Sequence, residues 1–143
     1  MSIWTGPSIG ITEQATAEES LGTLVWTAGV APSGTIDAVY KYERIGSIGI
    51  FSIRIEASVG GTSVTQVQFK LPAKVDQPNQ WASAAANDFQ YMGAGQITNG
   101  TAAPAAGPNI AVMTYDGTNW QCFVISASVN GNTVCADWVY SLT

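Results

Sequence analysis

The stretch YKYERIGSIGIFSIRIEASVGGTSVTQVQFKL, residues 40–71, decides the fold because it contains three strand-like runs separated by two glycine turns. Apolar and polar side chains alternate along each run, which is the period of a strand with one buried and one solvated face. Gly46 opens the first turn, and Gly60 and Gly61 supply residues that accept the positive φ of a second, tight turn. The pattern therefore predicts an antiparallel meander. Its buried face carries Ile36, Ala38, Tyr40, Tyr42, Phe51, Ile53, Ile55, Ala57, Val67, Phe69 and Leu71.

The last third of the chain predicts a second hairpin, in which residues 121–129 pair with residues 133–142 around an Asn-Gly turn. That register places Phe123 opposite Trp138 in the core and puts both cysteines on the other face. Cys122 and Cys135 would then lie roughly 13 Å apart along neighbouring strands. A disulfide tolerates at most ~7 Å between α carbons, so we expect two free thiols.

Together these runs predict an all-β chain that forms a single antiparallel β-sandwich of jelly-roll type over residues 23–143. Short strands are expected at residues 24–27 and 110–115. Residues 1–22 contain few large apolar side chains and are expected to form an N-terminal arm or a short helical segment. Residues 81–92 combine alanines that favour helix with a strand-like alternation; we interpret them as strand, followed by a loop over residues 93–108 with a short strand at residues 96–98.

Composition limits the partners of this domain. Only 10% of the 143 residues are charged, where about 25% is usual, and the chain lacks an apolar run of the about 18 residues that a membrane span requires. The net charge of −5 at pH 7 comes without the basic stripe that nucleic-acid binding needs. Either other subunits cover part of this weakly charged surface, or the protein is a monomer with a neutral polar surface. The N-terminus lacks the features of a secretory signal, so we expect synthesis and folding in the cytoplasm.

The residue types that most hydrolases use are scarce. The chain contains no histidine, which removes nucleophilic triads and the usual zinc sites. Asp37 and Glu43 flank Lys41 and resemble a pair of glycosidase carboxylates, but all three lie on the polar face of a strand, where solvated charge is the ordinary explanation. Asp116 and Asn119 fit a hairpin turn better than a calcium loop. We therefore predict no enzymatic activity, no cofactor and no metal.

Five tryptophans remain to be explained. Trp26 and Trp138 lie in apolar strands, where packing accounts for them. The others lie at loops or strand ends, where aromatic side chains serve subunit contacts or stack on sugars. The candidate interface or ligand-contact aromatics are Trp4, Trp81, Tyr91 and Trp120.

The run AVYKYERIGSIGIFSIRIEAS, followed by VQFKLP, resembles β-sandwich domains of tailed-bacteriophage virion proteins. In those domains a tyrosine strand leads to an Arg-Ile/Val-Gly turn, then to an alternating strand and to a strand ending in Leu-Pro, and a late strand ends in an aromatic residue. The matching residues are Tyr40, Tyr42, Arg44, Ile45, Gly46, Leu71, Pro72 and Tyr140.

The resemblance implies a virion structural protein, most simply a capsid decoration or cement protein that forms a homotrimer and contacts the major capsid protein or another virion protein. The alternative is a receptor-binding tip of a tail fibre or head fibre that meets a host surface glycan, although the chain lacks a repeat-rich shaft. A carbohydrate-binding module is the third interpretation.

Overall fold

In the computed structural model of the chain, residues 12–79, 90–98, 110–129 and 133–142 are described. Every regular element within these ranges is a β-strand, which confirms the all-β prediction. The strands are β1 (Thr12–Ala15), β2 (Glu19–Ser20), β3 (Val25–Thr27), β4 (Ser33–Ile45), β5 (Ile48–Val59), β6 (Val64–Lys70), β7 (Gln90–Thr98), β8 (Ile110–Tyr115), β9 (Trp120–Val129) and β10 (Thr133–Ser141).

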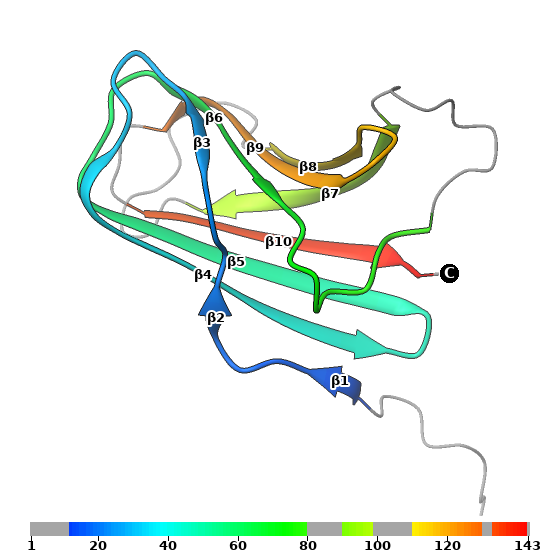
Figure 1. The fold of residues 1–143 in the computed structure, drawn as a ribbon. Helices are drawn as coiled ribbons and strands as arrows, with labels where there is room; N and C mark the ends of the chain where they lie inside the picture. The colour runs from blue at the N-terminus through cyan, green and yellow to red at the C-terminus, as the bar shows by residue number, and fades with distance from the viewer. Residues whose placement is uncertain (1–11, 80–89, 99–109, 130–132, 143) are drawn as a thin grey trace, which may run out of the picture.

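The strands pack as two antiparallel layers, so the predicted β-sandwich is confirmed (Figure 1). One layer has the order β4-β5-β10-β7, with β1 and β2 on the outer edge of β4, and the other has the order β8-β9-β6-β3. Strand β7 joins the layers at one side, because Gly95–Thr98 pair with β10 while Gln90–Gln96 pair with β8. The inner faces of the two layers enclose the core.

A short crossing segment, residues 19–27, joins the layers at the other side, and we call it the strap. Its first part, β2, pairs with β4, and Leu21 donates its N–H to the carbonyl of Ala38 at 2.8 Å. Its last part, β3, pairs with β6 in the opposite layer. Gly22, in the middle, has a φ of 86°, a conformation that glycine adopts without the steric cost of a side chain. The strap thus leaves one layer and enters the other within a few residues.

Half of the predicted meander is correct. Strands β4 and β5 pair around Gly46, which has a positive φ, but β5 does not pair with β6. Gly60 and Gly61 are not among the glycines with positive φ, and a Cβ added to Gly61 would lie 2.5 Å from the carbonyl oxygen of Val30. Gly61 therefore lies in close contact with the main chain of Val30, at the point where the chain passes to the second layer, and the hairpin expected there is wrong.

The predicted hairpin between residues 121–129 and 133–142 is also wrong. Strand β9 pairs with β6 and β8, whereas β10 pairs with β5 and β7. As a result Cys122 and Val124 point into the core cluster with Trp138, and Phe123 does not belong to that cluster. The pairs β5–β10, β6–β9 and β7–β8 are nested along the chain. The complete jelly-roll connectivity remains a prediction.

An aromatic cluster fills the space between the layers. The ring of Phe51 on β5 lies 5.7 Å from Tyr40, 5.7 Å from Trp138 and 6.3 Å from Phe69, measured between centroids. Phe69 comes from β6 in the opposite layer and also meets the edge of Trp138 at 6.3 Å. The alternating residues predicted to be buried in β5 and β6 are buried as expected, so the faces of these strands were predicted correctly even though their pairing was not.

Strand β7 covers only part of the segment interpreted from its alternation. Gln90–Thr98 form the strand, so the strand prediction is correct for residues 90–92, and residues 81–89 lie outside the described residues. The short strand expected at residues 96–98 is correct and forms the end of β7, whereas residues 93–95, expected to be loop, are also strand. Residues 99–108 lie outside the described residues.

Candidate functional site

The charged residues of the described chain mostly serve structural ion pairs. Arg54, on the outer face of β5, lies 3.4 Å from Asp37, 3.5 Å from Glu18 and 3.5 Å from Glu56. All four side chains are substantially exposed, so the cluster resembles an ordinary surface network. Asp37, one of the two carboxylates weighed as a glycosidase pair, is thus a partner of Arg54.

A second polar group fastens the loop after β6. The hydroxyl of Tyr42 donates to the carboxylate of Asp76 at 2.9 Å, and the hydroxyl of Tyr140 donates to the Asp76 carbonyl at 3.0 Å. Arg44 lies 3.6 Å from the same carboxylate. Burial, followed by the hydrogen bond to Asp76, raises the pKa of Tyr42 above its usual value. Both tyrosines therefore act as neutral donors that hold this loop against the end of the sandwich.

The strap is held at its start by a similar arrangement. Glu19 accepts a hydrogen bond from the Tyr40 hydroxyl at 3.0 Å and one from the Lys74 ammonium at 3.0 Å. The hydrogen bond from Lys74, and then that from Tyr40, lower the pKa of the Glu19 carboxyl. These contacts fix the first residues of the strap where they leave β4.

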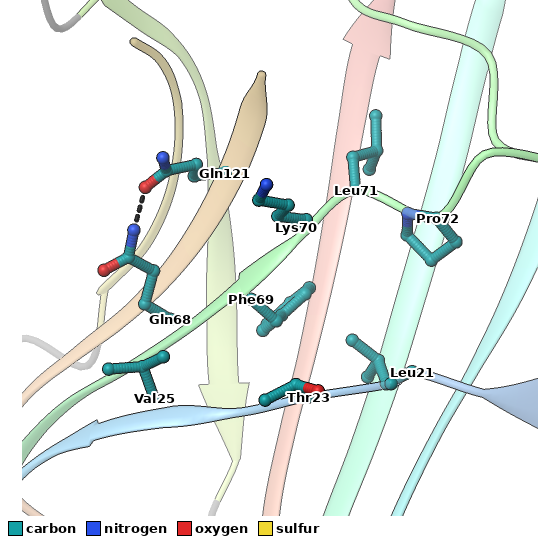
Figure 2. Close-up of a pocket in the computed structure, with 10 residues that line it drawn as sticks. Leu21, Thr23, Val25, Gln68, Phe69, Lys70, Leu71, Pro72 and Gln121 are labelled. Carbon is teal, nitrogen blue, oxygen red and sulfur yellow. Dashed lines mark hydrogen bonds between the residues drawn. The ribbon is translucent and has the colours of Figure 1, made fainter. Parts of the chain in front are cut away.

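A hollow of the described surface lies between the strap and the end of β6 (Figure 2). We call it the strap pocket. It has a volume of about 530 Å³, within the range of about 300–1,000 Å³ typical of ligand sites. Figure 2 shows Leu21 and Phe69 in the space between the two ribbons, with Leu71 and Pro72 at one end and Val25 at the other. Its walls are therefore mainly apolar.

One wall of the strap pocket is an ordered chain of amides. Gln68 donates from Nε2 to the Oε1 atom of Gln121, and Gln121 donates to the Asp116 carboxylate at 2.6 Å. The other carboxylate oxygen accepts the main-chain N–H groups of Asn119 at 2.7 Å and Thr118 at 2.9 Å. These main-chain hydrogen bonds lower the pKa of the Asp116 carboxyl. The turn after β8 thus orients Gln121, which in turn orients Gln68.

The main chain of Lys70 faces the strap pocket. Leu71 donates its N–H to the carbonyl of Trp120 at 3.0 Å, so its main chain points toward β9. Successive residues of a strand direct their main-chain groups to opposite sides, and those of Lys70 therefore point toward the strap. In the register that pairs Gln68 with Val25, Lys70 would face Thr23. However, β3 begins at Val25, and within the described residues no hydrogen bond joins the main chains of Thr23 and Lys70.

Of the predicted aromatic contact residues, Trp120 and Tyr91 lie in the described part of the chain. Trp120 is only 4% exposed and packs on Tyr115, with ring centroids 4.8 Å apart, so little of this indole remains for a partner. Tyr91 lies on β7, paired with Thr114. Trp4 and Trp81 lie outside the described residues. Sequence patterns did not indicate the strap pocket, because it arises where β3 and β6 diverge.

The described part of the chain offers no metal-binding cluster, membrane-spanning helix or disulfide. No group of three or more acidic, cysteine or histidine side chains there is suited to hold a metal ion, and no helix there is long and apolar enough to cross a membrane. Both cysteines are free, as predicted. The reason differs from the predicted one, because the two cysteines are not on paired strands. Cys122 lies in the core on β9, whereas Cys135 lies on β10, opposite Arg54 of β5 and Thr98 of β7. Burial raises the pKa of the Cys122 thiol.

Comparison of the chain with protein-family models, with curated proteins and with solved structures finds no match.

Proposed function

We propose that the chain is a bacteriophage virion structural protein that assembles as a homotrimer on the capsid, where it decorates or cements the shell. The observation that carries this proposal is a weakly charged β-sandwich with large apolar side chains exposed on a sheet face. The threefold arrangement and the place on the capsid come from the sequence resemblance alone.

Two of the exposed large apolar side chains, Ile48 and Val139, lie at one end of the outer face of β4, β5 and β10. Val139 is 61% exposed and pairs with Ile50, while Ile48 is 44% exposed and pairs with Ile45. Residues directly opposite one another in a sheet share a face, so these four form one surface, which we call the outer apolar patch. The ion pairs of Arg54 lie farther along the same face, toward the other end of β5.

We assign the outer apolar patch to contact with further copies of this chain. Obligate interfaces are large and apolar, typically about 2,000 Å² or more in total, and resemble a domain core divided in half. Lysine at position 139 would place a charge in such an interface. Val139→Lys should therefore dissociate the assembly, whereas Val30→Lys, at a 60% exposed position near the opposite end of β5, serves as the matched control and should leave it intact.

An image reconstruction of the virion whose genome encodes the chain tests the location. Density for the sandwich at trimeric positions on the capsid surface is the expected result. Density at a fibre tip would favour the receptor-binding alternative, and absence of the protein from the particle would contradict a virion role.

A further inference from the structure

We propose that the strap pocket binds an extended peptide segment of a partner protein, one that presents an apolar side chain next to a carboxylate. The segment pairs its main chain with that of Lys70, at the point where the β3–β6 ladder is interrupted. This site is separate from the outer apolar patch, and the proposal stands whatever the oligomeric state of the chain.

The first support is the interrupted ladder itself. Strand β6 is flanked by β9 along its whole length, but by β3 only as far as Gln68. The N–H and C=O of Lys70 consequently point into the pocket without a main-chain partner in the described residues. A neighbouring donor and acceptor at a sheet edge are the groups that bind an extended peptide in β-strand addition.

The second support is the apolar floor beside these groups. Leu21 and Phe69 are buried below the opening, and Val25 and Leu71 flank it. A peptide that pairs with Lys70 directs its side chains alternately to the two faces of the sheet, so one of them would enter this floor. Among the described residues that line the pocket, Phe69 is the only aromatic one, and the residue is almost wholly buried. The pocket therefore lacks the exposed aromatic surface on which a sugar ring would stack.

The third support is charge. Although the chain carries a net charge of −5, no acidic residue is among the described residues that line the strap pocket, whereas Lys70 is, with its side chain on the side of β6 that faces Gln121 (Figure 2). Arg44, Arg54 and Lys74 all have carboxylate partners. Lys70 forms no ion pair with any residue of the described ranges. Its ammonium is available to a carboxylate of the incoming peptide.

Amide hydrogen exchange measured by NMR tests the proposal, with acetyl-Thr-Val-Thr-Val bearing a free C-terminal carboxylate as the probe. In the free protein the amide of Lys70 should exchange rapidly, whereas that of Leu71, which is bonded to Trp120, should be protected. At a peptide concentration of about ten times Kd, exchange at Lys70 should slow roughly tenfold, since it proceeds from the unbound fraction.

Matched probes and variants separate the contributions of the peptide carboxylate, the Lys70 side chain and the main-chain hydrogen bonds to binding. The same peptide with a C-terminal carboxamide should bind about two- to fivefold more weakly, as expected for one exposed ion pair. Lys70→Ala should remove that difference while retaining the main-chain groups. Lys41→Ala, which changes a lysine on β4, should preserve it. A peptide N-methylated at its two central residues should not protect Lys70.

Three results would overturn the proposal. Exchange at the Lys70 amide that the peptide does not slow at millimolar concentration would exclude strand addition. Protection of this amide in the free protein at every protein concentration would mean that another part of the chain already pairs with Lys70. Protection that increases with protein concentration would instead place a second copy of this chain in the pocket.

Discussion

Replacement of Phe51 by alanine tests whether the two layers meet where the structure places them. Phe51 has none of its surface exposed and contacts aromatic rings from three other strands, β4, β6 and β10. Phenylalanine-to-alanine changes in cores cost about 3–5 kcal/mol. Because the ring touches both layers, the cavity cannot close by movement of one side chain, and we expect a loss of about 4–5 kcal/mol, in the upper part of that range.

The matched control is Arg54→Ala, three positions farther along the same strand. Its side chain is 42% exposed and its ion pairs are surface pairs, so we expect a loss of about 1 kcal/mol or less. Urea melts measure both changes. With an m value of about 2 kcal/mol/M, the Phe51 variant should lower the midpoint by roughly 2 M. Equal losses in the two variants would refute the assignment of the inner and outer faces of β5.

Three further predictions concern the thiols, a tight glycine and pH. In the native protein a thiol reagent should modify Cys135 and leave buried Cys122 unmodified until the chain unfolds; an intact mass lighter by the two hydrogens lost on forming a disulfide would contradict this. Gly49→Ala should lower the free energy of unfolding by about 1–3 kcal/mol in a urea melt, because its Cβ would lie 2.8 Å from the ring of Tyr140; an unchanged midpoint would show that the ring moves aside. The lowered pKa of Asp116 means that its contribution to stability is present above its unfolded pKa and is lost as the pH falls below about 4. Asp116→Asn should therefore reduce the acid dependence of the urea midpoint, and an identical pH profile would contradict the contribution.

The buried faces of individual strands could be predicted from the sequence, because the alternation of apolar and polar residues is a local pattern. Alternation along β5 and β6 identified their buried faces, because each strand has one clearly apolar side, as at Phe51 and Phe69. The buried face of β9 could not be predicted in this way. Phe123 and its neighbours Cys122 and Val124 are all apolar, so alternation does not distinguish the two faces of the strand.

Pairing between distant strands was not predictable from turns. Gly60 and Gly61 have the composition of a hairpin turn, yet neither has a positive φ, and Gly61 lies close to the main chain of Val30 where the chain changes layer. The strap pocket has no sequence signature for a related reason. It depends on the part of the strap before Val25 lying apart from β6, beyond the pair of Val25 with Gln68, which is a property of the three-dimensional path.

Sedimentation equilibrium at low and high salt tests the central claim, that this chain is an assembly module. The described residues form few ion pairs, and the four residues of the outer apolar patch are uncharged, although Glu43 lies opposite Ile50 on the same face. Assembly should therefore depend mainly on apolar burial and respond little to screening. We predict a trimer in both conditions. A monomer in both conditions would contradict the account, and a monomer that binds a glycan would replace it with the carbohydrate-binding interpretation.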